Sequence, residues 1–199
     1  MTSLKQTPSQ TLGPFFAYGL TPEQYGYAHR GIADNMLAAP HVPGEHVRIE
    51  GRIFDGAGAP IDDAMIEIWQ ADADGHYAGA ERNEAGSDAG GAVFSGFGRC
   101  GSDDAGEFWF ATIKPGAIGD GQAPHIGVIV QARGILNHAF TRIYFADDAD
   151  ANGDDPVLQS VPKDRRHTLI AARHETPAGP VYRFNIQMQG DDETVFFDV

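Results

Sequence analysis

The stretch from Thr112 to Gly134 holds the side chains of this chain that are best suited to chemistry. His125 stands out there because Pro124 fixes the backbone just before it and an apolar strand pattern follows it. Imidazole nitrogens ligate transition metals. Arg133 lies near the end of the stretch, and a guanidinium can attract and orient a carboxylate. Metal binding and anion binding are therefore the two chemistries to consider.

Motifs for other chemistries are absent. The eight His lack any HExxH or His-x-His spacing, and there is no CxxC, so no local zinc or ferrous signature exists. The chain also has no GxSxG, no P-loop and no GxGxxG after a strand. It therefore lacks the usual sequence motifs for acyl hydrolysis, nucleotide hydrolysis and dinucleotide-dependent hydride transfer. Cys100 follows Arg99, whose charge could lower the thiol pKa, although a lone Cys is more often inert.

Short strands must position these side chains. Residues 46–55 alternate the apolar Val47, Ile49 and Ile53 with polar neighbours, which is typical of a half-buried strand. Further strands are expected at 64–71, 106–113, 125–133, 140–145, 181–189 and 194–198, separated by Gly, Asp and Pro turns. This pattern predicts an all-β fold, an antiparallel β-sandwich with a few short helices.

Other segments depart from the strand pattern. Residues 1–44 are rich in Pro and aromatic side chains, so we expect an extended N-terminal arm, with a weak helix at Asp34–Ala39, before a sandwich domain at 45–199. The glycine-rich segment Gly79–Gly101 indicates a long surface loop, and Lys163–Arg173 indicates a helix. The arm must bury its aromatic surface either on its own domain or on a partner subunit.

The charge and composition exclude several classes of protein. The 28 acidic and 14 basic residues give a net charge of −14, which opposes nucleic-acid binding. The acidic clusters indicate solvated loop tips, with calcium loops as an alternative that no complete EF-hand spacing supports. A single Cys excludes an intrachain disulfide and favours the cytoplasm. No signal-peptide run and no apolar segment of about 18 residues occurs, so no membrane association is expected.

Several segments resemble the intradiol ring-cleaving dioxygenases that act on catechols. They are residues 7–16, 51–77, 98–116, 123–134, 141–145 and 182–199, in order along the chain. The resemblance implies a β-sandwich core and a ferric ion held by two Tyr and two His. Tyr77 matches the first tyrosine and His125 the first histidine, but Ile118 and Gly127 stand at the other two ligand positions. Because Ile and Gly cannot ligate iron, we expect no metal site in this chain.

The same resemblance implies a heteromer of two homologous chains, of which only the beta chain holds Fe(3+). This chain resembles the iron-free one, so its expected partner is an iron-binding beta chain. The implied substrates are protocatechuate, a carboxylated catechol, and O2, in aromatic catabolism through the β-ketoadipate pathway. The positions implied to line the partner's substrate cavity are Thr11, Gly13, Pro14 and Phe15, with Arg133 at the mouth.

Three alternatives stay open at this point. A self-sufficient dioxygenase could rebuild a site from Tyr77 and His125 with Tyr144 or His138. A β-sandwich of this kind could also be a binding or scaffold module without a catalytic part. Judged without the resemblance, Arg133 is a strand-end arginine in a routine ion pair, and the Gly and Pro of the arm form a simple bend.

Overall fold

The computed structural model describes residues 14–28, 31–78 and 94–198, and the strands of this part form one mixed nine-stranded sheet. The strands are β1 (His46–Phe54), β2 (Met65–Gln70), β3 (Phe97–Gly101), β4 (Glu107–Ile113), β5 (His125–Gln131), β6 (Ala139–Phe145), β7 (Ile170–Thr176), β8 (Gly179–Arg183) and β9 (Ile186–Gln187). Their order is β3-β2-β5-β6-β7-β8-β1-β4, and β9 pairs with β1.

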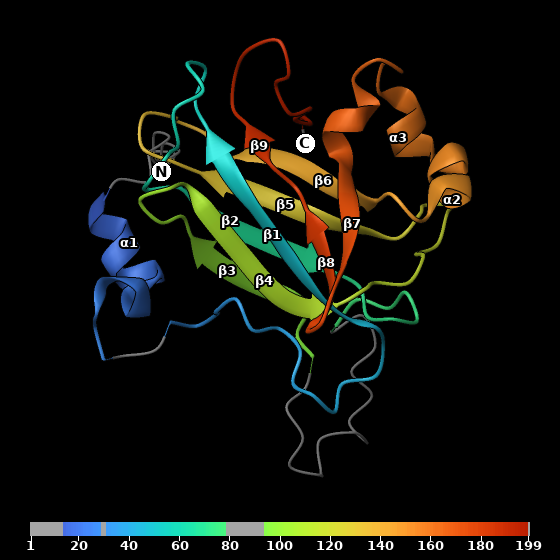
Figure 1. The fold of residues 1–199 in the computed structure, drawn as a ribbon, viewed down its shortest axis with the longest axis horizontal. Helices are drawn as coiled ribbons and strands as arrows, with labels where there is room; N and C mark the ends of the chain where they lie inside the picture. Colours follow the sequence, from blue (N-terminus) through green and yellow to red (C-terminus); the bar gives the residue numbers. More distant parts are fainter. Residues whose placement is uncertain (1–13, 29–30, 79–93, 199) are drawn as a thin grey trace, which may run out of the picture.

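The sheet folds over into two layers that enclose the core. One layer contains β3, β2, β5 and β6, the other contains β7, β8, β1 and β4, and Figure 1 shows β1 crossing over β5 and β6. Ile49 and Phe110 of one layer and Ile66 and Ile143 of the other are essentially fully buried in the same apolar cluster. Burial of these side chains away from water is the main force that holds the layers together.

The predicted all-β sandwich is confirmed, but the sheet is not purely antiparallel. β6 pairs with β7 in parallel, and β1 pairs in parallel with both β8 and β9. The segment expected as one strand at 181–189 is split between β8 and β9. The expected strand at 194–198 is wrong as well, since only Phe197 forms an isolated bridge, to Phe140.

Short helices lie at two opposite sides of the sheet (Figure 1). α1 (Pro14–Leu20) and the 3₁₀ helix η1 (Pro22–Tyr25) lie at one side, and α2 (Ala149–Asp154) and α3 (Pro156–Ser160) at the other. The expected helix at Lys163–Arg173 is wrong. It is reduced to a 3₁₀ turn, η2 (Arg166–Leu169), because Ile170 already begins β7, which is paired with β6 and β8.

The expected helix at Asp34–Ala39 is also wrong, because this segment is extended along the two free sheet edges. The Arg99 amide of β3 donates to the Asp34 carbonyl at 2.9 Å. On β4, the Ala111 amide donates to the Asn35 carbonyl and the Leu37 amide to the Ala111 carbonyl, both at 2.8 Å. Unpaired edge groups of the sheet therefore determine the local conformation.

The expected loop at Gly79–Gly101 is partly wrong. Residues 79–93 lie outside the described residues, but Phe97–Gly101 forms β3, paired in antiparallel register with Met65–Trp69 of β2. Glycines at 98 and 101 weakened the strand pattern in the sequence. The structure explains them, since a Cβ at Gly98 would collide with Leu37 and one at Gly101 with Gln24.

Candidate functional site

The four positions that the resemblance matches to iron ligands, Tyr77, Ile118, His125 and Gly127, lie on or beside the outer face of the layer that contains β2, β5 and β6. Along β5, residues 126, 128 and 130 point into the core, so His125 and Gly127 belong to the opposite face. In the antiparallel register, His125 is opposite Tyr144 of β6, and Gly127 lies between Arg142 of β6 and Trp69 of β2. These positions form two adjacent rows across the strands.

His125 is held in one orientation. It is buried to 4% exposure, and its Nδ1 is 2.8 Å from the Ala123 carbonyl oxygen, to which it donates. Nε2 is thereby left as the nitrogen with a free lone pair in the neutral ring. Burial lowers the pKa of His125, and the nearby positive charge of Arg142 lowers it further. The ring is therefore a neutral imidazole near pH 7.

Tyr77 and Ile118 are brought near this face by a turn and a loop that touch each other. Tyr77 follows β2 and stacks on Trp69, with ring centroids 6.3 Å apart and planes inclined by 15°. Gly75 has φ of +85°, and a Cβ there would collide with the carbonyl oxygen of Ala117, next to Ile118. Only glycine allows this approach of the two segments. Burial raises the pKa of Tyr77, and the charge of Arg142 opposes the rise.

Arg142 is the residue of this face that sequence reasoning missed. Its Nη1 donates to Gln122 Oε1 at 2.8 Å and lies 3.4 Å from the Tyr144 hydroxyl. Tyr144 is fully buried, donates to Asp155 Oδ1 at 3.1 Å, and has its pKa raised to about 12, chiefly by burial. The alternation in residues 140–145 places Arg142 and Tyr144 on one side of a strand. The sequence therefore contained the alternation that puts these two side chains on one face, but it did not show that Arg142 pairs with Gly127.

The donors that remain do not fit a ferric ion. Tyr77 and His125 could each supply one ligand atom, but Ile118 and Gly127 have none to offer. Within the described ranges, no group of three or more His, Cys, Asp or Glu could hold a metal ion. The alternative of a site rebuilt with Tyr144 or His138 gains no support, because Tyr144 is already bound to Asp155 and His138 packs edge-on against Phe140.

The predicted substrate-binding positions are only partly visible. Thr11 and Gly13 lie outside the described residues. Pro14 and Phe15 are the first residues of α1, and the structure describes their backbone but not their side chains. Arg133 lies beyond the end of β5 with its side chain 62% exposed, 2.9 Å from Asp63 and 3.7 Å from Asp62. The structure does not bring Arg133 together with Tyr77 and His125, so the two predicted groups belong to different surfaces.

Arg133 and the arm nevertheless share one neighbourhood. Burial raises the pKa of Tyr25 in η1, and the charges of Asp63 and Asp62, the partners of Arg133, raise it further. Next to Tyr25, Gln24 Nε2 donates to the Ser102 carbonyl at 2.6 Å. The arm is thus fixed beside the 61–64 turn, which Arg133 also contacts.

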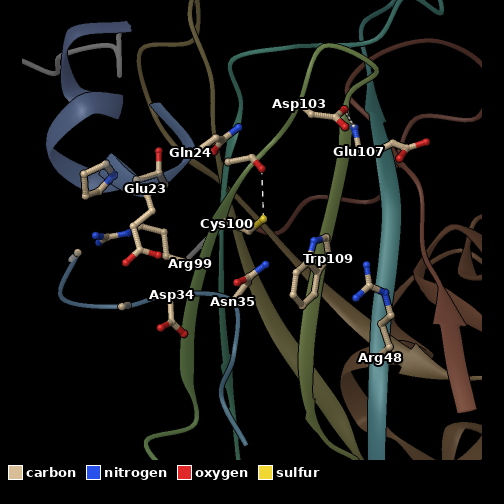
Figure 2. A pocket seen from close by; sticks show the side chains of 15 residues that line it. Glu23, Gln24, Asp34, Asn35, Arg48, Arg99, Cys100, Asp103, Glu107 and Trp109 are labelled. Carbon is tan, nitrogen blue, oxygen red and sulfur yellow. Dashed lines mark hydrogen bonds between the residues drawn. The ribbon is translucent and has the colours of Figure 1, made fainter. Parts of the chain in front are cut away.

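A cavity lies elsewhere in the described part of the molecule, between the arm and the two free edges. It has a volume of about 500 Å³ and opens between β3 and β4, with η1 and residues 31–35 on its other side (Figure 2). Arg48 stacks on Trp109 in its wall, 4.0 Å from the ring centroid. Of the predicted site residues whose side chains the structure describes, none lines this cavity.

Cys100 lines this cavity but is not an activated thiol. Burial raises its pKa, against the opposing effects of a backbone hydrogen bond from Trp109 and the charge of Arg48. The idea that Arg99 lowers this pKa is wrong, because the Arg99 guanidinium turns away to Glu67, with Nη2 2.6 Å from Oε1. A nucleophilic role for the thiol is not supported.

The acidic turns have a structural explanation. Asp72 Oδ1 accepts the amides of Asp74 and His76 at 3.0 and 2.9 Å, and Asp103 Oδ1 accepts those of Ala105 and Glu107 at 2.9 and 2.8 Å. Such Asx turns use the carboxylate to close the loop. Loop tips therefore account for Asp72 and Asp103. The same expectation is wrong for Asp155 at the end of the 147–155 cluster, which is fully buried and accepts the Leu158 amide and the Tyr144 hydroxyl.

Comparison with known proteins defines the class of protein. A family model described as "Dioxygenase" matches residues 13–190. An intradiol ring-cleavage dioxygenase from Tetranychus urticae has a similar fold, with a TM-score of 0.63 at 16% identity, covering 85% of this chain and 94% of that one. The chain belongs to the family of intradiol ring-cleavage dioxygenases, which are oxidoreductases.

Within this family the chain groups with the alpha chains of protocatechuate 3,4-dioxygenase. It is 52% identical to the alpha chain from Burkholderia cepacia over the full length of both chains. It is 44% identical to the alpha chain from Pseudomonas putida, covering 98% of this chain and 97% of the relative. The beta chain from Burkholderia cepacia is 29% identical over 97% of this chain and 88% of its own length. Alpha and beta chains are therefore homologous, which implies a hetero-oligomer.

In the described part of the chain, no helix is long and apolar enough to cross a membrane.

Proposed function

We propose that this chain is the iron-free alpha subunit of a protocatechuate 3,4-dioxygenase, whose ferric site is held by a homologous beta chain. The reaction is the cleavage of protocatechuate by O2 to 3-carboxy-cis,cis-muconate, in the β-ketoadipate pathway of the cytoplasm. Both oxygen atoms enter the product, so no external reductant is consumed. The observation that carries the proposal is the outer face of β5, where Gly127 has no ligand atom and faces the cation of Arg142.

The exposed side chains of the arm support a role in assembly. Phe16, Tyr25 and Tyr27 are 51%, 38% and 48% exposed, and Ile32 is 91% exposed. Tyr18 holds the aromatic side chains together, with ring centroids 4.9 Å from Tyr25 and 5.8 Å from Tyr27. Clustered apolar exposure of this kind is typical of a surface that a partner covers. Residues 1–44 then act as an interface arm and residues 45–199 as the sandwich domain.

The arm and Arg133 are the parts of this chain that act on substrate in this proposal. Thr11, Gly13, Pro14 and Phe15 line the partner's cavity, where small or rigid residues allow close approach of the backbone to an aromatic ring. Arg133 lies at the mouth and attracts the ring carboxylate of the substrate, which the charge of −14 on the chain otherwise repels. Its guanidinium would exchange Asp62 and Asp63 for that carboxylate.

The test is to express the chain alone and together with a homologous chain that carries the complete Tyr and His-x-His set. Alone, the chain should be colourless and iron-free, whereas the complex should be red-brown, contain iron and cleave protocatechuate. A single purified chain that holds one iron and shows the colour of ferric tyrosinate would support the self-sufficient enzyme instead. A homologous chain that is fully active without this one would support the scaffold alternative.

A further inference from the structure

The row of side chains across the outer face has a gap at Gly127. Trp69 on β2 and Arg142 on β6 are its paired neighbours on either side. Among the described residues, a Cβ at Gly127 would meet the Trp69 carbonyl oxygen alone, at 3.4 Å, which is an ordinary contact. The backbone can therefore accept a Cβ here, so a clash at the first side-chain atom does not explain why this position has no ligand.

Arg142 brings a positive charge to this gap that no carboxylate neutralises directly. Among the described residues, its guanidinium has no carboxylate within ion-pair distance, and its partners are the neutral Gln122 and Tyr144. The nearest acidic group in this network is Asp155, which is reached only through the hydroxyl of Tyr144. A half-buried cation without a counter-ion acts strongly on its surroundings, because water screens it poorly.

The remnant donors lie within the field of this cation. Burial lowers the pKa of His125 most and the charge of Arg142 lowers it further, whereas the Ala123 hydrogen bond and the charge of Asp155 oppose the shift. The charge of Arg142 also acts to lower the pKa of Tyr77, against the effect of burial. The His125 ring lies 5.7 Å from that of Tyr144, whose hydroxyl contacts Arg142. Any metal ion bound between Tyr77 and His125 would thus stand close to a fixed positive charge. A metal cation and a guanidinium that are both shielded from water repel each other strongly in a protein interior.

We propose that Arg142 takes the place of the metal as the positive charge of this face and excludes a metal ion from it. On this proposal, the loss of two ligands is only half of the reason why the chain binds no iron. Restoring ligands is then insufficient while the guanidinium is present. Because Arg142 belongs to this chain, its effect does not depend on assembly with a beta subunit.

The first test uses Gly127→His, which adds a second imidazole two residues from His125 on the same face of β5. The full-length chain is titrated with Co²⁺, and binding is followed by the visible spectrum. The variants compared are Gly127→His alone and Gly127→His combined with Arg142→Gln, Arg142→Met or Arg142→Lys. We expect the double variants with Arg142→Gln or Arg142→Met to bind Co²⁺ at least about tenfold more tightly than the variants that keep Arg or carry Lys at position 142.

Equal Co²⁺ affinity in all four variants, whether high or too weak to detect, would overturn the proposal. Circular dichroism and melting curves establish that each variant is folded, and two neutral variants are used so that the result does not depend on one of them.

The second test adds Ile118→Tyr to the same set and measures iron content and ferric tyrosinate absorption after loading with Fe³⁺. Iron should be retained with Arg142→Gln and lost with the native Arg142. If the chains with Arg142 and with Arg142→Gln both retain iron, the ligands alone determine whether iron binds. If both lose it, Arg142 is not what keeps iron out.

Discussion

Glu67 on β2 and Arg99 on β3 form a nearly buried ion pair, with Arg99 Nε and Nη2 at 2.8 and 2.6 Å from Glu67 Oε1. Their side chains are only 11% and 8% exposed. Arg99 also joins the arm to the sheet, since its amide donates to Asp34 and its Nη1 lies 3.5 Å from the Leu20 carbonyl at the end of α1. One residue thus links the free edge of the sheet, the outer face and the arm.

Arg99→Ala should lower the free energy of unfolding by about 3 kcal/mol, because it leaves the carboxylate of Glu67 buried without its partner. The measurement is urea denaturation of the purified chain. Arg52→Ala is the matched control, since the side chains of Arg52 and Glu107 in that ion pair are 52% and 50% exposed. The control should cost less than about 1 kcal/mol. Equal losses in the two variants would contradict the importance assigned to Arg99.

The stability of the chain should fall in acid because of a cluster around Arg173. Its hydrogen bond holds the pKa of Glu45 below the ordinary value of 4.5. Burial alone would raise the pKa of Asp147, but hydrogen bonds from Lys114 and Tyr182 outweigh it and lower the pKa below 3.8. A lowered pKa stabilises the fold above the unfolded value, and this stabilisation is lost as the pH falls through the folded value.

Unfolding free energy should therefore be steady above about pH 5 and decline between about pH 5 and pH 3. Arg173→Gln should flatten that decline, as followed by urea denaturation at a series of pH values. Arg166→Gln serves as the control, because Arg166 bonds to Gln159 and to the Val161 carbonyl rather than to a carboxylate. An unchanged slope for Arg173→Gln would show that this cluster does not set the acid response.

Two strand glycines should respond in opposite ways to a methyl group. In Gly51 of β1, a Cβ would collide with the backbone carbonyl of Phe184, which a side-chain rotation cannot relieve. Gly51→Ala should therefore destabilise the chain by at least about 2 kcal/mol. The Cβ that Gly127→Ala adds would lie 3.4 Å from the Trp69 carbonyl oxygen, without a clash. This variant should be as stable as the native chain or up to about 1 kcal/mol more stable. Melting curves of both variants test this, and similar melting temperatures for the two would contradict it.

The sequence predicted the strands best where a hydrophobic period of two was unbroken. Residues 46–55 alternate Val47, Ile49 and Ile53 toward the core, and β1 follows this pattern with all three side chains buried. The period fails where glycine replaces side chains, as in β3. There a Cβ would meet the side chains of Leu37 and Gln24 in the arm, which pack directly on the glycines, and no local signal carries that information.

Helices were predicted poorly because tertiary pairing overrode local propensity. Leu169 and Ile170 suggested the apolar side of a helix, but Leu169 packs beside Tyr144 and Ile170 pairs with that residue at the start of β7. The same limit applies to the site. Tyr77 and His125 could be recognised from a resemblance, whereas Arg142 acquires its meaning only from the register that sets it opposite Gly127.

Arg133→Ala in the assembled enzyme should raise the apparent KM for protocatechuate by about three- to tenfold and leave kcat nearly unchanged. In the proposed assembly, the guanidinium of Arg133 attracts the carboxylate of the substrate without touching the reacting carbons, so it contributes to binding alone. Asp63→Asn should have the opposite effect on KM, because it removes the carboxylate that lies 2.9 Å from the guanidinium. Steady-state oxygen uptake at low ionic strength is the measurement.

Arg183→Ala is the matched control for Arg133→Ala. Arg183 is 63% exposed and pairs with Glu50 at 3.1 Å, so its replacement removes the same charge from an equally open position. A KM that rises equally in both variants would mean that net charge alone attracts the substrate. With uncharged catechol as substrate, Arg133→Ala should have no effect on KM, and an equal rise with catechol would show that Arg133 shapes the cavity instead of reading the carboxylate.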